Sequence, residues 1–342
     1  MTLRTAIIGA GRIGRLHARN AAAHPRMKIV AVHDVDPARA TALAQRHGAR
    51  ATDTLDAALA LADVAVIASS TDTHAETALA VARAGKPMYL EKPVDLDFEK
   101  ALSTAAALRD LDVPVMIGFN RRFDTAYREL RGHIRQGALG RIQIVQMTSR
   151  GPNEAPTREY IAHSGGIYRD KTIHFFDLLR YLTGREVGEV YALGATHADP
   201  FIGELGDVDT CVLQLRLDDD SFCQIDNTRR AAYGFDERIE VLGTKGLREA
   251  GRGRSPMALA DERGIFGASL PTGFMHRFEA AFGHAMDGFV RHVIEGDPDV
   301  PTVDDGIAAQ RIAEAAAESA REGHPVSVAA TTRKAMQAPA SK

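Results

Sequence analysis

The first 120 residues alternate between short apolar runs and longer segments with the spacing of amphipathic helices. The apolar runs are typical of strands buried in a parallel sheet. They are Ala6–Ile8, Ile29–Val32, Val64–Ala68, Met88–Leu90 and Val115–Ile117. Segments rich in Ala, Leu, Arg and Glu separate them, at Ile13–Ala23, Pro37–His47, His74–Ala84 and Leu96–Asp110. This order predicts βαβ units, and therefore an α/β domain with a doubly wound parallel sheet over residues 1–120.

The pattern changes after about residue 120, where apolar and polar residues begin to alternate with a period of two. Such alternation predicts a mainly antiparallel sheet that is covered on one face only. It is found in Arg141–Ser149, Cys211–Leu217, Phe222–Asn227 and Arg238–Leu242, and Asp218–Asp220 predicts a hairpin turn. Helices are predicted at Thr125–Arg135, Thr172–Leu182, Phe278–Ile294 and Asp304–Glu322. We therefore expect a second, α+β domain over residues 121–330, with an open sheet, and a flexible polar tail over 331–342.

Composition and charge exclude several classes of protein. The chain has 342 residues, 45% of them apolar and 25% charged, which suits two globular domains. Its formal charge of −3 argues against a nucleic-acid partner, and it has no apolar run of the roughly 18 residues that a membrane span needs. The start of the chain shows no secretory pattern, and two cysteines without a CxxC motif predict a reducing cytoplasm. The histidines and cysteines have no metal-ligand spacing, so we expect no metal.

A glycine-rich turn follows the first predicted strand and opens the first predicted helix. Gly9, Gly11 and Gly14 form a GxGxxG motif, with Arg12 and Ile13 between the last two glycines. Such a turn brings free backbone N–H groups to a pyrophosphate. Asp34 ends the second strand 20 residues after Gly14, where a carboxylate accepts hydrogen bonds from ribose hydroxyls and repels a 2′-phosphate. The motif therefore predicts NAD as cofactor; nearby arginines leave NADP open, and a turn without a ligand is the simpler alternative.

Two further clusters carry candidate chemistry. Glu91-Lys92-Pro93 follows the fourth strand, and the carboxyl end of a parallel strand opens on the ligand crevice. Lys92 could there stabilise the oxygen of a substrate, although a surface lysine beside a proline turn has the same pattern.

Asp170 and His174 are four residues apart in a predicted helix, so they share a face. A histidine beside a carboxylate can accept a proton near neutral pH, but ordinary helix ion pairs would look alike.

These segments together resemble the Gfo/Idh/MocA oxidoreductases, and within them the inositol 2-dehydrogenase branch. The resemblance extends over nearly the whole chain. It rests on the following segments: AIIGAGRIGRLHA, VAVHDVD, THAETALAVARAGKPMYLEKP, IGFNRRFD, SGGIYRDKTIHFFDLLRYLTG, IDNTRRAAYGFDERIEVLGTKG and PTVDDG. It implies an N-terminal Rossmann domain, a C-terminal α/β domain with an open sheet, and a homotetramer or dimer.

The resemblance also implies roles for individual residues. Lys92, Asp170 and His174 match the catalytic group of the family. Further positions are implied for the cofactor and for the substrate. The cofactor set adds Ser69, Ser70, His74, Glu91, Lys92, Asn120 and Arg121 to the glycine turn and Asp34. The substrate set is Lys92, Asn120, Asp170, His174, Arg180 and Tyr233.

The implied reaction is oxidation of a secondary alcohol of a cyclic polyol, myo- or scyllo-inositol, to the ketone by hydride transfer to NAD. The sequence departs from the branch close to the expected substrate, with Phe175 after the histidine and a different loop over Pro152–Arg158. These departures leave the polyol open, and a pyranose dehydrogenase fits equally well. A glycosidase that uses NAD for transient oxidation, and a redox-sensing binding protein, are the alternatives from other classes.

Overall fold

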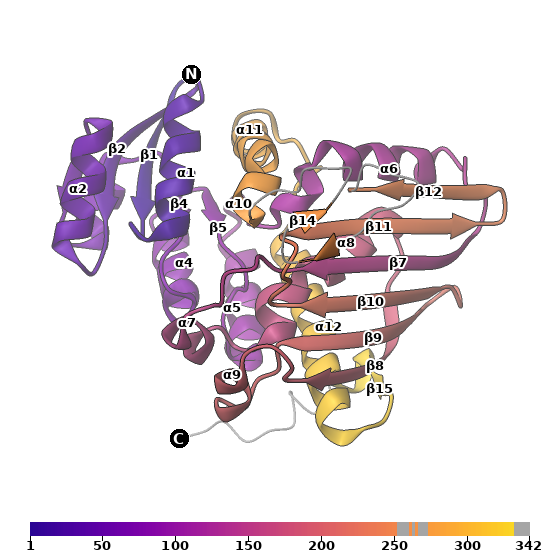
Figure 1. The fold of residues 1–342 in the computed structure, drawn as a ribbon. Coiled ribbons are helices and arrows are strands. Elements are labelled where there is room, and N and C mark those ends of the chain that lie inside the picture. The colour runs from indigo at the N-terminus through magenta and orange to yellow at the C-terminus, as the bar shows by residue number, and fades with distance from the viewer. Residues whose placement is uncertain (252–259, 262–263, 266–272, 332–342) are drawn as a thin grey trace. The chain divides into compact units, whose positions relative to one another are not determined.

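The computed structural model describes residues 1–251, 260–261, 264–265 and 273–331 of the chain (Figure 1). The fold divides into two compact units, and each is described separately below. The first contains residues 1–120 together with 280–307, and the second contains residues 121–279 together with the chain from 308 onward. The sequence pattern places a single boundary after residue 120, whereas in the structure residues 280–307 belong to the first unit.

The first unit is built on a six-stranded parallel sheet with the order β3-β2-β1-β4-β5-β6. This order reverses direction at β1 and β4, as in dinucleotide-binding folds, and ligands bind at the carboxyl ends of the strands at such a point. The strands are β1 (Leu3–Ile8), β2 (Met27–His33), β3 (Arg50–Thr52), β4 (Val64–Ile67), β5 (Met88–Leu90) and β6 (Val115–Ile117). The parallel sheet predicted for this part of the chain is confirmed.

The helices of the first unit begin at residues that the sequence chemistry favours. Asp36 caps the first turn of α2 by accepting from the backbone N–H groups of Ala38 and Arg39, and Pro37 occupies the first helical position. The helices are α1 (Arg12–Ala23), α2 (Pro37–His47), α3 (Leu55–Leu61), η1 (Thr71–Thr73), α4 (His74–Arg83) and α5 (Phe98–Asp110). The returning helix α11 (Glu279–Glu295) adds aromatic contacts, since Phe289 lies edge-on to the buried Tyr89.

The second unit contains a seven-stranded sheet with the order β12-β11-β7-β10-β9-β8-β15. Its pairs are antiparallel except for β7 and β10, which run parallel. The strands are β7 (Ile142–Arg150), β8 (Val187–Ala195), β9 (Thr210–Leu217), β10 (Phe222–Thr228), β11 (Asp236–Gly243), β12 (Gly246–Ala250) and β15 (Val326–Ser327). A separate short pair joins β13 (Ala260–Asp261) to β14 (Gly264–Ile265). The mainly antiparallel sheet and its β9–β10 hairpin are therefore confirmed.

The two faces of this sheet differ in the way that the period-two pattern predicts. Alternate residues of β9, from Cys211 to Leu217, are buried, and both cysteines are free thiols in this core. Large apolar side chains also remain exposed on the opposite face. They are Ile144, Leu193, Val212 and Phe222, on β7, β8, β9 and β10. The sheet therefore has a covered inner face and an outer face with exposed apolar side chains.

Several helices complete the second unit. They are α6 (Thr125–Arg135), α7 (Arg158–His163), η3 (Tyr168–Thr172), α8 (Ile173–Thr183), α9 (Pro200–Glu204) and α10 (Phe274–Arg277). Two further helices, η2 (Asn120–Phe123) and α12 (Val303–Glu322), begin in the first unit and continue into the second. The segment η3 is a π-helical turn that runs directly into α8, where the sequence predicts a regular helix from Thr172 onward. π-Helical turns are frequent at functional sites, and this one contains Asp170. The predicted tail lies, apart from Thr331, outside the described residues.

Candidate active site

The glycine-rich turn between β1 and α1 has the geometry that a pyrophosphate site requires. A Cβ atom on Gly9, whose φ is +96°, would lie 2.5 Å from the Ala68 carbonyl oxygen, and one on Gly14 would lie 1.9 Å from the Gly9 carbonyl oxygen. Nothing lies within 4 Å of the corresponding position on Gly11. No side chain caps the start of α1 at Gly11. The turn therefore offers open space and backbone N–H groups to an anion, because the side chains that would fill it are missing.

Asp34 lies at the end of β2 and contacts the same turn. Its Oδ2 atom accepts from the Ala10 backbone N–H at 2.6 Å, and Oδ1 accepts from the Asp36 backbone N–H at 2.8 Å. Each carboxylate oxygen has a second lone pair, so both can still accept from a ribose hydroxyl. Arg12 and Ile13 form the first turn of α1, and Arg12 is exposed. These residues fit an NAD molecule with its adenosine ribose at Asp34.

His74 and Ser69, which the resemblance assigns to the cofactor set, have protein partners. The His74 Nδ1 atom lies 2.8 Å from the Pro93 carbonyl oxygen, and Nε2 lies 3.2 Å from the Ser69 carbonyl oxygen. Burial lowers the pKa of His74, which favours the neutral ring, and the shorter contact then assigns the proton to Nδ1. The Ser69 hydroxyl shares a 2.8 Å hydrogen bond with Thr73, whose hydroxyl also donates to the Ser70 carbonyl oxygen. His74 therefore holds the loop after β5 against the end of β4.

Glu91 and Lys92 follow β5, and Glu91 is joined to α1. The Glu91 Oε1 atom lies 2.7 Å from His17 Nε2, and its Oε2 atom accepts from the Lys92 backbone N–H at 3.3 Å. Burial raises the pKa of Glu91, but the His17 hydrogen bond and the positive charges of His17 and Lys92 lower it by more, so the carboxylate stays ionised. A Cβ on Gly118 would lie 2.9 Å from Glu91 Oε2. Glu91 therefore acts on this site by fixing the backbone of Lys92.

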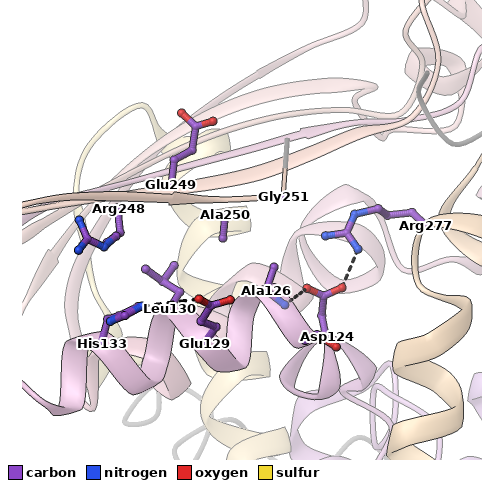
Figure 2. Close-up of a pocket in the computed structure, with 11 residues that line it drawn as sticks. Asp124, Ala126, Glu129, Leu130, His133, Arg248, Glu249, Ala250, Gly251 and Arg277 are labelled. Carbon is purple, nitrogen blue, oxygen red and sulfur yellow. Dashed lines mark hydrogen bonds and ion pairs between the residues drawn. The ribbon is translucent and has the colours of Figure 1, made fainter. Parts of the chain in front are cut away.

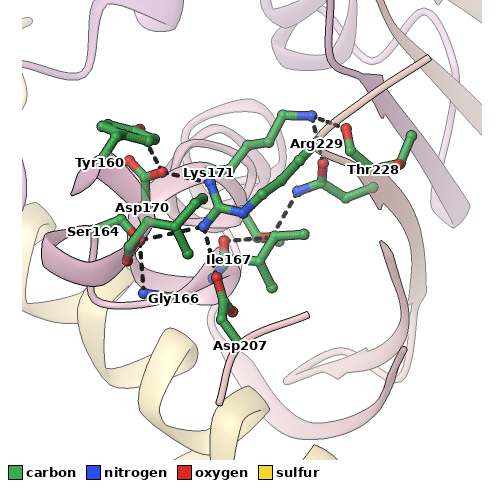
Figure 3. A network of polar contacts seen from close by, with 12 residues as sticks. Tyr160, Ser164, Gly166, Ile167, Asp170, Lys171, Asp207, Thr228 and Arg229 are labelled. Carbon is green, nitrogen blue, oxygen red and sulfur yellow. Dashed lines mark hydrogen bonds and ion pairs between the residues drawn. The ribbon is translucent and has the colours of Figure 1, made fainter. Parts of the chain in front are cut away.

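In the second unit, Asp170 is the centre of a set of polar contacts (Figure 3). Its Oδ2 atom accepts from the Tyr160 hydroxyl at 2.6 Å and from Arg229 Nη1 at 2.9 Å. The Arg229 side chain is only 5% exposed. His174 lies one turn further along, in α8. The structure thus keeps Asp170 and His174 in one continuous helical segment, although a π turn replaces the regular helix face that the spacing predicts.

Arg229 bridges Asp170 to a second carboxylate. Its Nη2 atom donates to Asp207 Oδ2 at 3.1 Å, and the other Asp207 oxygen accepts from the Ile167 backbone N–H at 2.9 Å. Gly166, with φ +89°, lies beside this contact, and a Cβ there would be 3.2 Å from Asp207 Oδ1. Neither Arg229 nor Asp207 belongs to the catalytic, cofactor or substrate sets expected from the sequence. Arg229 does, however, continue the buried face of β10, which is a signal of a charge that needs partners inside the protein.

Lys171, also missed by the sequence analysis, points from the same turn to the inner face of the sheet. Its Nζ atom donates to Asn227 Oδ1 at 2.8 Å and to the Thr228 carbonyl oxygen. Burial lowers the pKa of Lys171 to about 7; the charge of Glu237 opposes this shift and that of Arg229 adds to it. A group that titrates near neutral pH therefore lies directly beside Asp170 in the chain.

The remaining candidates are placed as follows. Arg121 forms a buried, two-pronged ion pair with Glu237, so its guanidinium is committed to the scaffold of the second unit. Arg180 pairs with Glu186 through Nε and Nη2 at 2.8 and 2.7 Å. The Tyr233 hydroxyl donates to Asp236 at 3.1 Å, and Asn120 is 1% exposed at the end of the first unit. Lys92 belongs to the first unit, whereas Asp170 and His174 belong to the second.

A cavity of about 560 Å³ lies between α6 and β12 in the second unit (Figure 2). Its lining includes Asp124, which caps α6 and pairs with Arg277 at 2.6 Å, and His133, which lies 3.7 Å from Glu129. No residue of the catalytic or cofactor sets lines this cavity. We therefore do not assign the chemistry to it.

Both parts of the chain match one oxidoreductase family. Residues 3–119 match the "NAD-binding Rossmann fold" of the GFO_IDH_MocA oxidoreductase family, and residues 131–328 match its "C-terminal alpha/beta domain". The chain therefore belongs to the Gfo/Idh/MocA oxidoreductases, and it binds NAD through its Rossmann domain. Within the described part of the chain, no helix could span a membrane and no cluster of side chains is arranged to hold a metal ion.

The relatives of this chain within the family include dehydrogenases named for inositol. The chain is 40% identical to an inositol 2-dehydrogenase of Rhizobium meliloti, over 96% of this chain and 100% of the relative. It is 36% identical to a myo-inositol 2-dehydrogenase of Thermotoga maritima, over 95% and 98%. It also resembles the crystal structure of a scyllo-inositol dehydrogenase from Lactobacillus casei with bound NAD(H) and scyllo-inositol. That match has a TM-score of 0.86 and 28% identity, over 96% of this chain and 100% of that one.

Two substitutions separate packing from nucleotide binding at the glycine turn. Gly14→Ala should lower the unfolding temperature, because its methyl group forces α1 away from Gly9 at a cost of about 1–3 kcal/mol. Gly11→Ala has an ordinary φ of −68° and open space, so it should keep the unfolding temperature and weaken NAD binding. Thermal unfolding with and without NAD measures both effects. Equal unfolding temperatures for the two variants would contradict the packing argument.

Proposed function

We propose that this protein oxidises a secondary alcohol of an inositol, myo- or scyllo-, to the corresponding ketone with NAD. The observation that carries the proposal is the pairing of a Rossmann turn open at Gly11 with a second unit that holds Asp170 and His174 in one helical segment. Relatives named as inositol 2-dehydrogenases, similar over nearly the full chain, support the substrate class.

In this proposal Lys92, Asp170 and His174 act on one substrate hydroxyl. A ring nitrogen of His174 accepts the hydroxyl proton, and Asp170 orients the imidazole. Lys92 donates to the substrate oxygen and stabilises the negative charge that develops there. NAD, when bound, accepts the hydride that leaves the carbinol carbon. Asn120 and Tyr233 are proposed to border the substrate, whereas the Glu186 partner of Arg180 favours a structural role for that arginine.

The substrate is tested with purified protein and either NAD or NADP. The panel contains myo-, scyllo- and chiro-inositol, several free aldoses and a glycoside, and rates are compared as kcat/KM. We expect NADH formation to be fastest with one of the inositols. Faster NADH formation from an aldose would instead make the protein a pyranose dehydrogenase. Sugar release from the glycoside without net NADH would indicate a glycosidase.

Lys92→Ala tests the charge-stabilising group. Loss of one donor to a developing oxyanion costs roughly 2.7–4 kcal/mol, so kcat should fall by about 10²–10³. The affinity for NAD should stay within about twofold, because the glycine turn and Asp34 are unchanged; fluorescence titration measures it. Lys100→Ala is the matched control, since Lys100 is a partly exposed lysine paired with Asp95. Near-normal kcat in Lys92→Ala would remove Lys92 from the proposed reaction.

We also propose a homotetramer in the cytoplasm, in which the outer face of the second sheet meets another subunit. The exposed Ile144, Leu193, Val212 and Phe222 on that face support this proposal. Light scattering should then give four chain masses, and Val212→Lys should lower that value, because a charge is buried at the interface. A monomer at assay concentration would contradict the assembly.

The proposed cytoplasmic location is tested by cell fractionation, in which the activity should remain in the supernatant.

A further inference from the structure

We propose that Arg229 is the positioning residue of Asp170: it fixes the carboxylate that orients His174. The proposal rests on the proposed function, because it takes the roles of Asp170 and His174 from there. Arg229 follows the last residue of β10 and is 59 residues from Asp170 in the sequence. It acts through Asp170 and is assigned no contact with substrate.

The guanidinium group of Arg229 contacts two carboxylates with separate nitrogens (Figure 3). One terminal nitrogen contacts Asp170 at 2.9 Å, and the other contacts Asp207 at 3.1 Å and lies 3.5 Å from the Ser164 hydroxyl oxygen. A planar fork with fixed donor directions can hold two carboxylates at once. The ammonium group of a lysine is a point charge on a flexible stem and cannot match both. The side chain at this position therefore fixes direction as well as charge.

The contacts of Arg229 also connect the loop before the π turn to a residue within the turn. Asp207 accepts from the Ile167 backbone N–H, immediately before the turn, while Asp170 lies within it. Ser164 accepts from the Gly166 backbone N–H at 3.2 Å. One buried guanidinium thus connects the loop that enters the turn to the carboxylate inside it. Because α8 continues from this turn, the same contacts set where Asp170 lies relative to His174.

Electrostatic interactions also hold Asp170 in place. Arg229 is 5% exposed and Asp170 and Asp207 are 14% and 12% exposed, so water screens these charges poorly. Two carboxylates this close to one another repel unless a cation lies between them. Arg229 provides that cation, and the Tyr160 hydroxyl adds a second donor to the same Asp170 oxygen. Asp170 is thereby held in one orientation before substrate binds.

A double-mutant cycle on kcat tests the proposal. Arg229→Lys should lower kcat by about ten- to a hundredfold, a loss as large as that seen when a residue that orients a metal ligand is replaced, with KM for NAD unchanged. In the Asp170→Asn background the same change should lower kcat by less than about twofold, because nothing remains to be positioned. A purely structural role predicts the same loss in both backgrounds, and that result would overturn the proposal.

Arg230→Lys is the matched control. Arg230 is the next residue, and it pairs with Asp199 at 3.1 Å while remaining 38% exposed. Its kcat should stay within about twofold of the wild-type value; a loss as large as that of Arg229→Lys would overturn the assignment to one arginine.

If Arg229→Lys does not fold, Asp207→Asn tests the same anchor from its other side. The remaining amide oxygen can still accept from the Ile167 N–H, while the charge that holds Arg229 is gone. The fall in kcat caused by Asp207→Asn should also be absent in the Asp170→Asn background. An equal fall in the wild-type and Asp170→Asn backgrounds would overturn the proposal. The wild-type protein shows which of the two proposals has failed. If it oxidises no inositol, the proposed function is wrong. If it oxidises an inositol but Arg229→Lys lowers kcat equally in both backgrounds, only the role of Arg229 is wrong.

Discussion

Largely buried carboxylates, each bonded to a basic side chain, hold the polar residues of both units in place. In the first unit Glu91 is paired with His17, and in the second Asp170 is paired with Arg229. Removing one partner of a buried ion pair leaves an uncompensated charge, which typically destabilises a protein by about 3–5 kcal/mol. The side chains therefore have little freedom to leave these arrangements. The position of the Asp170 carboxylate and that of the Lys92 backbone follow from this constraint.

The same constraint applies to two residues that the resemblance assigns to the cofactor, Glu91 and Arg121. Glu91 stands beside the proposed donor Lys92, yet its carboxylate is bonded to α1 and to the Lys92 backbone. Arg121 has the charge to bind a phosphate, yet Glu237 takes its guanidinium. Glu91 fixes the Lys92 backbone and Arg121 joins η2 to β11, while the cofactor role of both residues stays a prediction. The open position in the glycine turn is Gly11, where no side chain competes with the nucleotide.

Most of the fold could be predicted from the sequence, because it depends on local patterns. Continuous apolar runs identified the parallel strands, and the period of two identified the face of β9 that carries Cys211. The polar pairs could not be predicted in this way. Arg121 and Glu237 are 116 residues apart, and His17 and Glu91 are 74 apart. No local spacing relates such residues, so the sequence does not predict these protein partners, and the assignment of Glu91 and Arg121 to the cofactor by resemblance stays a prediction.

The burial of Arg229 could be predicted from the alternation of buried residues along β10, but its partner could not. The buried residues of β10 alternate from Cys223 through Ile225 to Asn227, and the next step in that series is Arg229. An arginine on the buried face of a strand implies a carboxylate nearby, since the cost of burying it alone is prohibitive. The pattern does not say which carboxylate, because many acidic residues lie in the loops. The fold selects Asp170 by bringing the end of β10 to the π turn, so the partner is a property of the topology and not of the strand.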